Sequence, residues 1–99
     1  MVKPAEEIID DILHYMKSLE FPFTSWYVGI AVNPSVALFT EHNVNVNSHW
    51  IYRYAGSVEN AEEILEQLMT RYHVRNNGEP VHRNARFIFA YAITSGTKQ

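Results

Sequence analysis

The sequence predicts a single two-layer domain of the α/β (α+β) class, with helices packed on a small three-stranded sheet. A chain of 99 residues can form one hydrophobic core and leaves little room for a second. Segments with apolar residues at helical spacing alternate with short runs rich in β-branched and aromatic residues. We therefore expect one domain over residues 1–99 in the order α-β-α-β-α-β, with flexible ends at 1–3 and 95–99.

The first helix is expected over residues 4–19. Pro4 suits the first helical turn, where its missing N–H has no partner to lose. One apolar stripe follows at helical spacing: Ile8, Ile9, Ile12, Leu13, Met16 and Leu19. Pro22 ends the helix because it disfavours the helical conformation at the residue before it.

The first strand is expected over residues 25–32, where successive side chains point to opposite faces. One face carries Trp26, Val28, Ile30 and Val32, and the other carries Tyr27, Gly29 and Ala31. A glycine inside a strand indicates close approach by a ligand, a backbone or a bulky neighbour.

A second helix is expected over residues 33–43, since Asn33 is a favourable N-cap and Pro34 a favourable first residue. Its core anchors are Leu38 and Phe39. The remaining elements follow from the same patterns. They are a strand over 49–55, a helix over 57–73, a turn over 76–80 and a last strand over 85–94.

Charge is divided unevenly along the chain. The net charge is −3, which argues mildly against a general nucleic-acid-binding protein. The segment from residue 71 onward is basic, however, with Arg71, Arg75, Arg83 and Arg86. This segment either binds an anion such as a nucleic-acid phosphate or complements the acidic helices.

The chain has no cysteine, no long apolar run and no signal-peptide core, so we expect a cytoplasmic protein without a membrane span.

Two groups of residues have competing interpretations. Trp50, Tyr52 and Tyr54 are expected to fill one face of the sheet under the first helix, or else to form a recognition surface with Trp26. The carboxylates of the third helix are expected to face solvent, although one of them could hold a magnesium ion: Glu59, Glu62, Glu63 and Glu66. The five histidines have no metal-ligand spacing.

The densest signal is WYVGIAVNP at residues 26–34, followed by LFTEHN at 38–43. These segments resemble the second half-motif of the GIY-YIG nuclease superfamily, and the close match covers about a fifth of the chain. In that family a strand with Tyr-Ile/Val-Gly leads into a helix with an arginine, a leucine and Glu-His. The resemblance implies cleavage of nucleic-acid phosphodiesters, with Mg²⁺ held by a glutamate on a later helix.

Carried onto this chain, the resemblance implies a site around Tyr27, Gly29 and His42, with Glu66 as the metal ligand. The register is ambiguous by one residue, so Leu65 could occupy the glutamate position instead. The tyrosine would assist the attacking water, and the arginine would steady the phosphate.

The chain departs from the family pattern at two places. Ala37 stands where the arginine is expected, and an alanine cannot stabilise the transition-state charge. The first half-motif, Gly-Ile-Tyr, is absent before Tyr27. We hypothesise that the last strand takes its place, with Tyr91 beside Tyr27.

The sequence therefore predicts a GIY-YIG-like scaffold that is catalytically impaired and binds nucleic acid. Two alternatives remain. One is an atypical metal-dependent nuclease in which Arg53, Arg83 or Arg86 replaces the missing arginine. The other is a protein-interaction module without nuclease ancestry.

Overall fold

The computed structural model describes residues 3–78 and 81–99 of the chain. The elements are α1 (Ala5–Ser18), η1 (Phe23–Ser25), β1 (Trp26–Ala31), α2 (Pro34–Val36), η2 (Ala37–Glu41), β2 (Trp50–Tyr54), α3 (Val58–Tyr72) and β3 (Phe87–Ala92). The predicted fold class and element order are confirmed, and the structure ends most elements one or two residues inside the predicted bounds. The expected turn at 76–80 and the expected flexible end at 1–3 lie partly outside the described residues.

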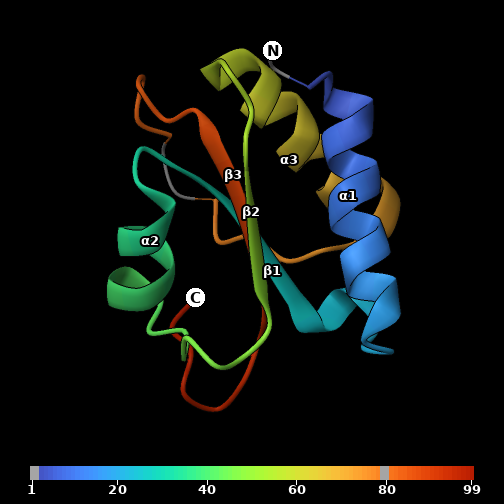
Figure 1. Ribbon diagram of the computed structural model, residues 1–99, viewed down its shortest axis with the longest axis vertical. Helices are drawn as coiled ribbons and strands as arrows, with labels where there is room; N and C mark the ends of the chain where they lie inside the picture. Colours follow the sequence, from blue (N-terminus) through green and yellow to red (C-terminus); the bar gives the residue numbers. More distant parts are fainter. Residues whose placement is uncertain (1–2, 79–80) are drawn as a thin grey trace.

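The sheet has the order β1-β3-β2, so the last strand of the chain is the central one (Figure 1). Both neighbouring pairs are antiparallel, with Tyr27 opposite Tyr91 and Tyr52 opposite Phe89. Helices α1 and α3 cover one face, while α2 and η2 cover the other (Figure 1). Within the described residues, none of the helices is long and apolar enough to cross a membrane.

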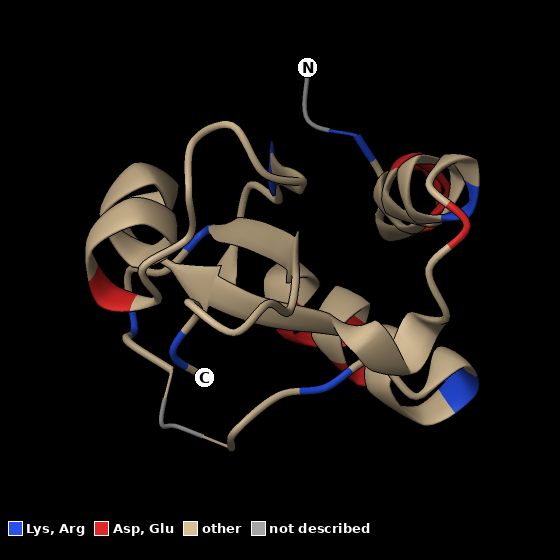
Figure 2. Ribbon diagram, turned by 90° about the horizontal axis from the view of Figure 1, so that it is seen from below, with Lys and Arg blue, Asp and Glu red and all other residues tan. Residues whose placement is uncertain are grey.

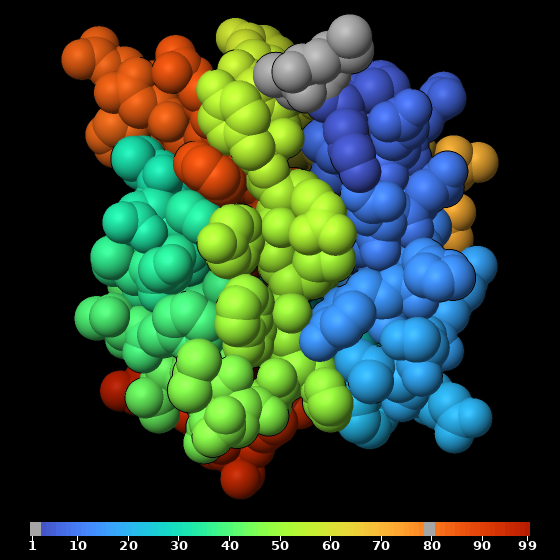
Figure 3. All heavy atoms as spheres, viewed as in Figure 1, coloured from blue at the N-terminus to red at the C-terminus, as the bar shows by residue number. Residues whose placement is uncertain are grey.

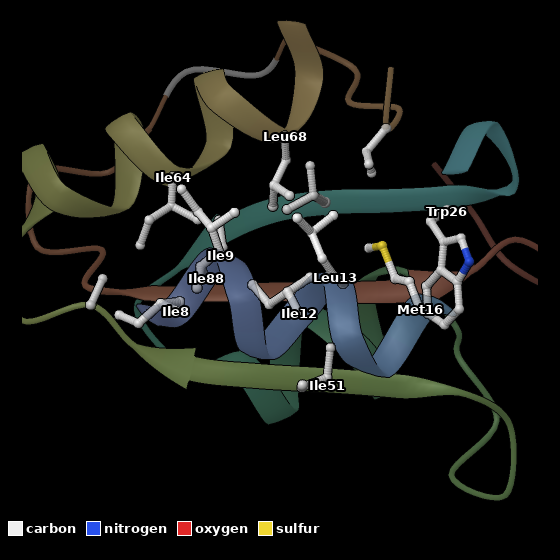
Figure 4. Packing of buried hydrophobic residues seen from close by; sticks show 14 of the residues in the cluster. Ile8, Ile9, Ile12, Leu13, Met16, Trp26, Ile51, Ile64, Leu68 and Ile88 are labelled. Carbon is white, nitrogen blue, oxygen red and sulfur yellow. The ribbon is translucent and has the colours of Figure 1, made fainter. Parts of the chain in front are cut away.

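The face under α1 and α3 is filled mainly by aliphatic side chains. Ile12 and Met16 of α1, Leu68 of α3 and Ile88 of β3 are fully buried there. Figure 4 shows side chains from both helices and from the strands converging on this core. Each buried side chain of this size contributes about 1.5–3 kcal/mol relative to exposure, so this face holds much of the stability of the domain.

The other face is aromatic. Its buried cluster contains Tyr27, Phe89 and Tyr91 from the sheet and Leu38 from η2. Phe39, the other predicted anchor, is half-buried against this cluster.

The prediction that Trp50, Tyr52 and Tyr54 fill the face under the first helix is wrong. Their neighbour Ile51 packs in the core with α1. Because side chains alternate along a strand, the three rings point to the opposite face. Tyr52 and Tyr54 remain 36% and 48% exposed. Trp26, the fourth residue of the alternative recognition surface, is fully buried in the aliphatic core.

Candidate functional site

A capped helical segment brings His42 to the aromatic face. The Asn33 side chain accepts hydrogen bonds from the backbone N–H groups of Ser35 and Val36, as an N-cap should. The helix then widens into the π-helical turn η2, in which the His42 N–H donates to the Ala37 carbonyl at 2.9 Å. π-turns of this kind occur often at functional sites. Here the turn directs His42 onto the sheet.

The His42 ring is buried, and its Nδ1 atom has two oxygen neighbours. These are the Lys98 carbonyl at 2.5 Å and the Tyr91 hydroxyl at 2.9 Å. A carbonyl can only accept, so Nδ1 must carry the hydrogen in the contact with Lys98. A neutral imidazole in this tautomer keeps an acceptor lone pair on Nε2.

Residues 94–99 fold back over this histidine. The Lys98 N–H donates to the His42 carbonyl at 2.7 Å, and the Asn43 side chain donates to the Gly96 carbonyl at 2.9 Å. Gly96 and Lys98 belong to the end at 95–99 that is expected to be flexible, and both are hydrogen-bonded to the segment that contains His42. These contacts fix the Nδ1 side of the histidine with groups from the far end of the described chain.

Tyr27, Tyr91 and His42 form one ring cluster. The Tyr27 and Tyr91 rings stack with centroids 5.2 Å apart, and the His42 centroid lies 4.8 Å from Tyr27 and 5.3 Å from Tyr91. The expectation that Tyr91 lies beside Tyr27 is confirmed. Burial raises the pKa of the Tyr91 hydroxyl well above its usual value, and the neighbouring Tyr27 raises it further.

Gly29 makes room for the ring that closes this cluster. Phe89 lies directly opposite Gly29 in the register, and its ring covers the glycine backbone. A Cβ atom at position 29 would meet Phe89 Cζ at 2.5 Å and Cε1 at 2.8 Å. The predicted close approach at Gly29 is therefore confirmed, and the bulky neighbour is Phe89.

A small cavity of about 60 Å³ lies against the cluster. It is lined by Tyr27, Gly29, Ile30, Ala37, Glu41, His42, Leu65, Asn76, Asn77, Val81 and Phe89. A cavity needs roughly 10–15 Å³ to hold one water molecule, so this cavity has room for a few waters. Tyr91 is not among the described residues that line it, whereas His42 and Tyr27 are.

The cavity wall contains the two positions at which the family resemblance was uncertain. Ala37, at the expected arginine position, forms part of the wall, and so does Leu65. Glu66 is exposed and does not line the cavity; it lines an adjoining groove that shares Leu65 and Val81 with the cavity.

Glu41 is the one carboxylate in the described lining of this cavity. Mg²⁺ is usually held by one or two carboxylates together with waters and substrate phosphates, so Glu41 is the residue of this lining that could ligate such an ion. More widely, the described part of the chain has no group of three or more His, Cys, Asp or Glu residues arranged to hold a metal ion.

The four arginines of the basic segment are exposed and fall into two groups. Arg75 lies near one end of the sheet, beside Tyr27, because the Arg75 N–H donates to the Trp26 carbonyl and the Val28 N–H donates to the Arg75 carbonyl, each at 2.9 Å. Arg71 precedes it at the end of α3. Arg83 and Arg86 lie near the other end, since Arg86 comes just before Phe87, the partner of Ala31.

Four residues of a strand separate these ends, which corresponds to about 13 Å. Figure 2 likewise shows Lys and Arg spread over several parts of the ribbon. Among the described residues lining the cavity there is no Lys or Arg.

A groove of about 390 Å³ adjoins the cavity on the side of Arg83 and Arg86. It shares Ile30, Ala37 and Glu41 with the cavity and continues to His82 and Ala85. The cavity and groove together form a path from the neighbourhood of Arg75 to that of Arg86.

Several residues of the site were not predicted from the sequence. Asn76 and Asn77 are part of the predicted turn, yet they line the cavity, and Asn76 donates to the Val28 carbonyl at 2.8 Å. Glu41 belongs to the LFTEHN segment, but its place on the wall depends on the π-turn. The Lys98 carbonyl has no side-chain signal that a sequence pattern could reveal.

Comparisons with protein-family models, with curated proteins and with solved structures found no match to this chain. The candidate site is therefore described by its own geometry.

Proposed function

We propose that this chain is a GIY-YIG-like domain that has lost efficient phosphodiester cleavage and binds nucleic acid. The observation that carries the proposal is the pairing of Tyr27 with Tyr91 on adjacent antiparallel strands, with the His42 ring against both. In this proposal β3 takes the place of the strand with the missing first half-motif. The site keeps its tyrosines and histidine on the scaffold, although the chain order of the strands is rearranged.

Two positions in the wall support impaired cleavage. Ala37 supplies no cation where the resemblance requires an arginine, and removing one group that stabilises a transition state typically costs about 10²–10³ in rate. Leu65 in the wall supplies no metal ligand, while Glu66 faces another groove.

The binding part of the proposal rests on the two arginine groups. A nucleic-acid backbone that follows the cavity and groove would meet Arg71 and Arg75 at one end and Arg83 and Arg86 at the other. Contacts of this kind weaken as salt concentration rises, because counterions are released on binding. Glu41 lies between the two groups and opposes a phosphate there.

The test is a titration of isotope-labelled protein with short single-stranded and duplex DNA, followed by amide NMR at low and high salt. We expect salt-sensitive changes in the amide chemical shifts of Tyr27, His42 and the four arginines. The Glu41→Gln variant should bind several-fold more tightly, because it removes the opposing charge. Glu63→Gln is the matched control, since it removes the same charge from an exposed residue that lines neither the cavity nor the grooves beside it.

Equal tightening by both variants would mean that only net charge matters, and it would contradict binding along this path. No shift with either DNA would remove DNA as the ligand. A cleavage assay with and without Mg²⁺ runs in parallel. Magnesium-dependent cleavage that is lost in Tyr27→Phe would contradict the impairment and support the atypical nuclease.

A further inference from the structure

The two outer edges of the sheet are treated differently. The edge of β1 is partly covered, because the Val28 N–H donates to the Arg75 carbonyl and the Arg75 N–H donates to the Trp26 carbonyl, each at 2.9 Å. Asn76 adds a side-chain bond to the Val28 carbonyl. The edge of β2 lies at the surface between α1 and the residues of α2, as Figure 3 shows.

The register identifies which backbone groups of β2 face outward. At one end of the ladder Ala92 donates to the His49 carbonyl, and at the other Ala55 donates to the Arg86 carbonyl. In an antiparallel pair the residues that bond to the partner alternate with residues that point away. The outward set is Trp50, Tyr52 and Tyr54.

Among the described residues, one side chain bonds to the outward backbone groups of this set. The Arg53 guanidinium donates to the Tyr52 carbonyl at 2.9 Å. The amide and carbonyl groups of an open strand edge form the pattern that another extended chain completes.

A strand added to this edge would send its side chains alternately to two surfaces. On one side lies a groove of about 370 Å³ between α1 and β2, lined by Asp11, His14, Tyr15, Ser18, Ile51 and Arg53. On the other side lie the rings of Trp50 and Tyr52, which stack with centroids 6.0 Å apart, and the exposed ring of Tyr54.

The charges of α1 indicate which side chains an added strand should direct toward the groove between α1 and β2. Glu7 and Asp11 lie one helical turn apart on the stripe that reaches the groove, and Asp10 is adjacent. Asp11 is bound by Lys3 and Arg53, whereas Glu7 and Asp10 have no ion-pair partner among the described residues. Basic side chains on this side of an added strand would supply those partners.

We infer that the free edge of β2 is a strand-addition site for an extended segment of a partner protein that alternates basic and apolar side chains. The basic side chains lie toward α1, and the apolar ones lie on the rings of Tyr52 and Tyr54. The strand adds antiparallel, as both pairs of the sheet do. A second copy fits less well. Two-fold antiparallel pairing of β2 would set both acidic α1 helices on the same face near the joint, where like charges repel.

The pairing geometry gives a sharp test. In antiparallel addition, residues directly opposite each other share a face. The peptide residues that bond to Trp50, Tyr52 and Tyr54 are therefore the apolar ones. The probe is a capped peptide of about eight alternating Lys and Val residues, which is enough to span the five residues of β2. One control peptide is N-methylated at its valines, a second at its lysines, and a third has Glu in place of Lys.

Amide NMR at low salt should show shifts at residues 50, 52 and 54 and along residues 7–14 with the Lys/Val peptide. Methylation of the valines should weaken binding about tenfold or more, because it removes the bonding N–H groups, whereas methylation of the lysines should not. The Glu peptide should also bind about tenfold more weakly, and the double variant Glu7→Gln/Asp10→Asn should reduce this preference for Lys.

The inference fails if the peptide causes no shift at residues 50–54, or if the two methylated peptides bind equally. Concentration-dependent shifts at the same amides without peptide, with a matching rise in mass by ultracentrifugation, would identify a second copy as the occupant and would also overturn it. Because the probe is a peptide and the protein is unaltered in the first experiment, none of these results depends on a variant that might not fold.

Discussion

The two faces of the sheet are packed by different chemistry. Beneath α1 and α3 the buried side chains are mostly isoleucine, leucine and valine, with Trp26 as the large ring. Beneath η2 the largest buried side chains are rings, and several rings carry polar atoms, such as the Tyr91 hydroxyl and the His42 imidazole. Aliphatic packing is non-directional and scales with buried area, whereas the polar rings need specific partners. We therefore assign most of the stability to the first face and the chemistry to the second.

The largest expected effect is on the aliphatic face. Leu68→Ala should lower the free energy of unfolding by about 2–5 kcal/mol, because it leaves a cavity in a fully buried site. Urea denaturation measures the loss. Leu65→Ala is the matched control on the same helix, since Leu65 is half-buried at the wall of the small cavity and should cost less. Because Leu65 packs at the margin of the same cluster, equal losses would show that full burial does not set the cost on this face.

The next effect is at the contact between β1 and β3 on the aromatic face. Gly29→Ala should lower the free energy of unfolding by about 1–3 kcal/mol, because the new methyl overlaps the buried Phe89 ring. If the overlap is the cause, Phe89→Leu in the same chain should recover part of the loss. A double-mutant cycle measures this coupling. Simple additivity would show that the glycine matters for another reason.

Tyr91 gives an effect that depends on pH. Its pKa is raised in the folded protein, so its contribution to stability is complete below about pH 10, the unfolded value. That contribution is lost as pH rises further, because only the unfolded state releases the proton. Tyr91→Phe should therefore flatten the alkaline fall in stability, and it should cost about 1 kcal/mol at neutral pH through the lost contacts of the hydroxyl with His42 and with the Lys98 carbonyl, to which it donates.

The matched control is Tyr54→Phe, which removes a hydroxyl from a ring that is 48% exposed and should cost much less stability at neutral pH. An alkaline limb that is the same in the Tyr91→Phe protein as in the wild type would show that the aromatic face is not a polar core of the kind described.

The smallest effect is at the junction between α1 and β2. The hydrogen bond from Lys3, followed by the bond from Arg53, holds the pKa of Asp11 below its ordinary value of 3.8, against the opposing effect of burial. Stability from this group is therefore present above about pH 4 and is lost as pH falls below it. Asp11→Asn should cost about 0.5 kcal/mol at pH 7 and less in acid. A loss that persists at pH 2 would mean that packing, and not charge, joins α1 to β2.

The sequence by itself determined the elements of this protein and much of their local structure. Helical spacing in α1 and α3, the Asn33-Pro34 start and the glycine in β1 each depend on interactions within a few residues or on the alternation of one strand. For that reason their positions, the fold class and the close approach at Gly29 could be read from the residue pattern alone.

Only the tertiary structure decided the contacts between distant segments. Alternation shows that Trp50 and Ile51 lie on opposite faces, but it cannot show which face α1 covers, and the prediction for the three rings failed there. The central position of β3, the presence of Leu65 at the cavity wall and the carbonyl of Lys98 beside His42 have the same origin. Each depends on how separate elements pack in three dimensions, and no local pattern of residues encodes that packing.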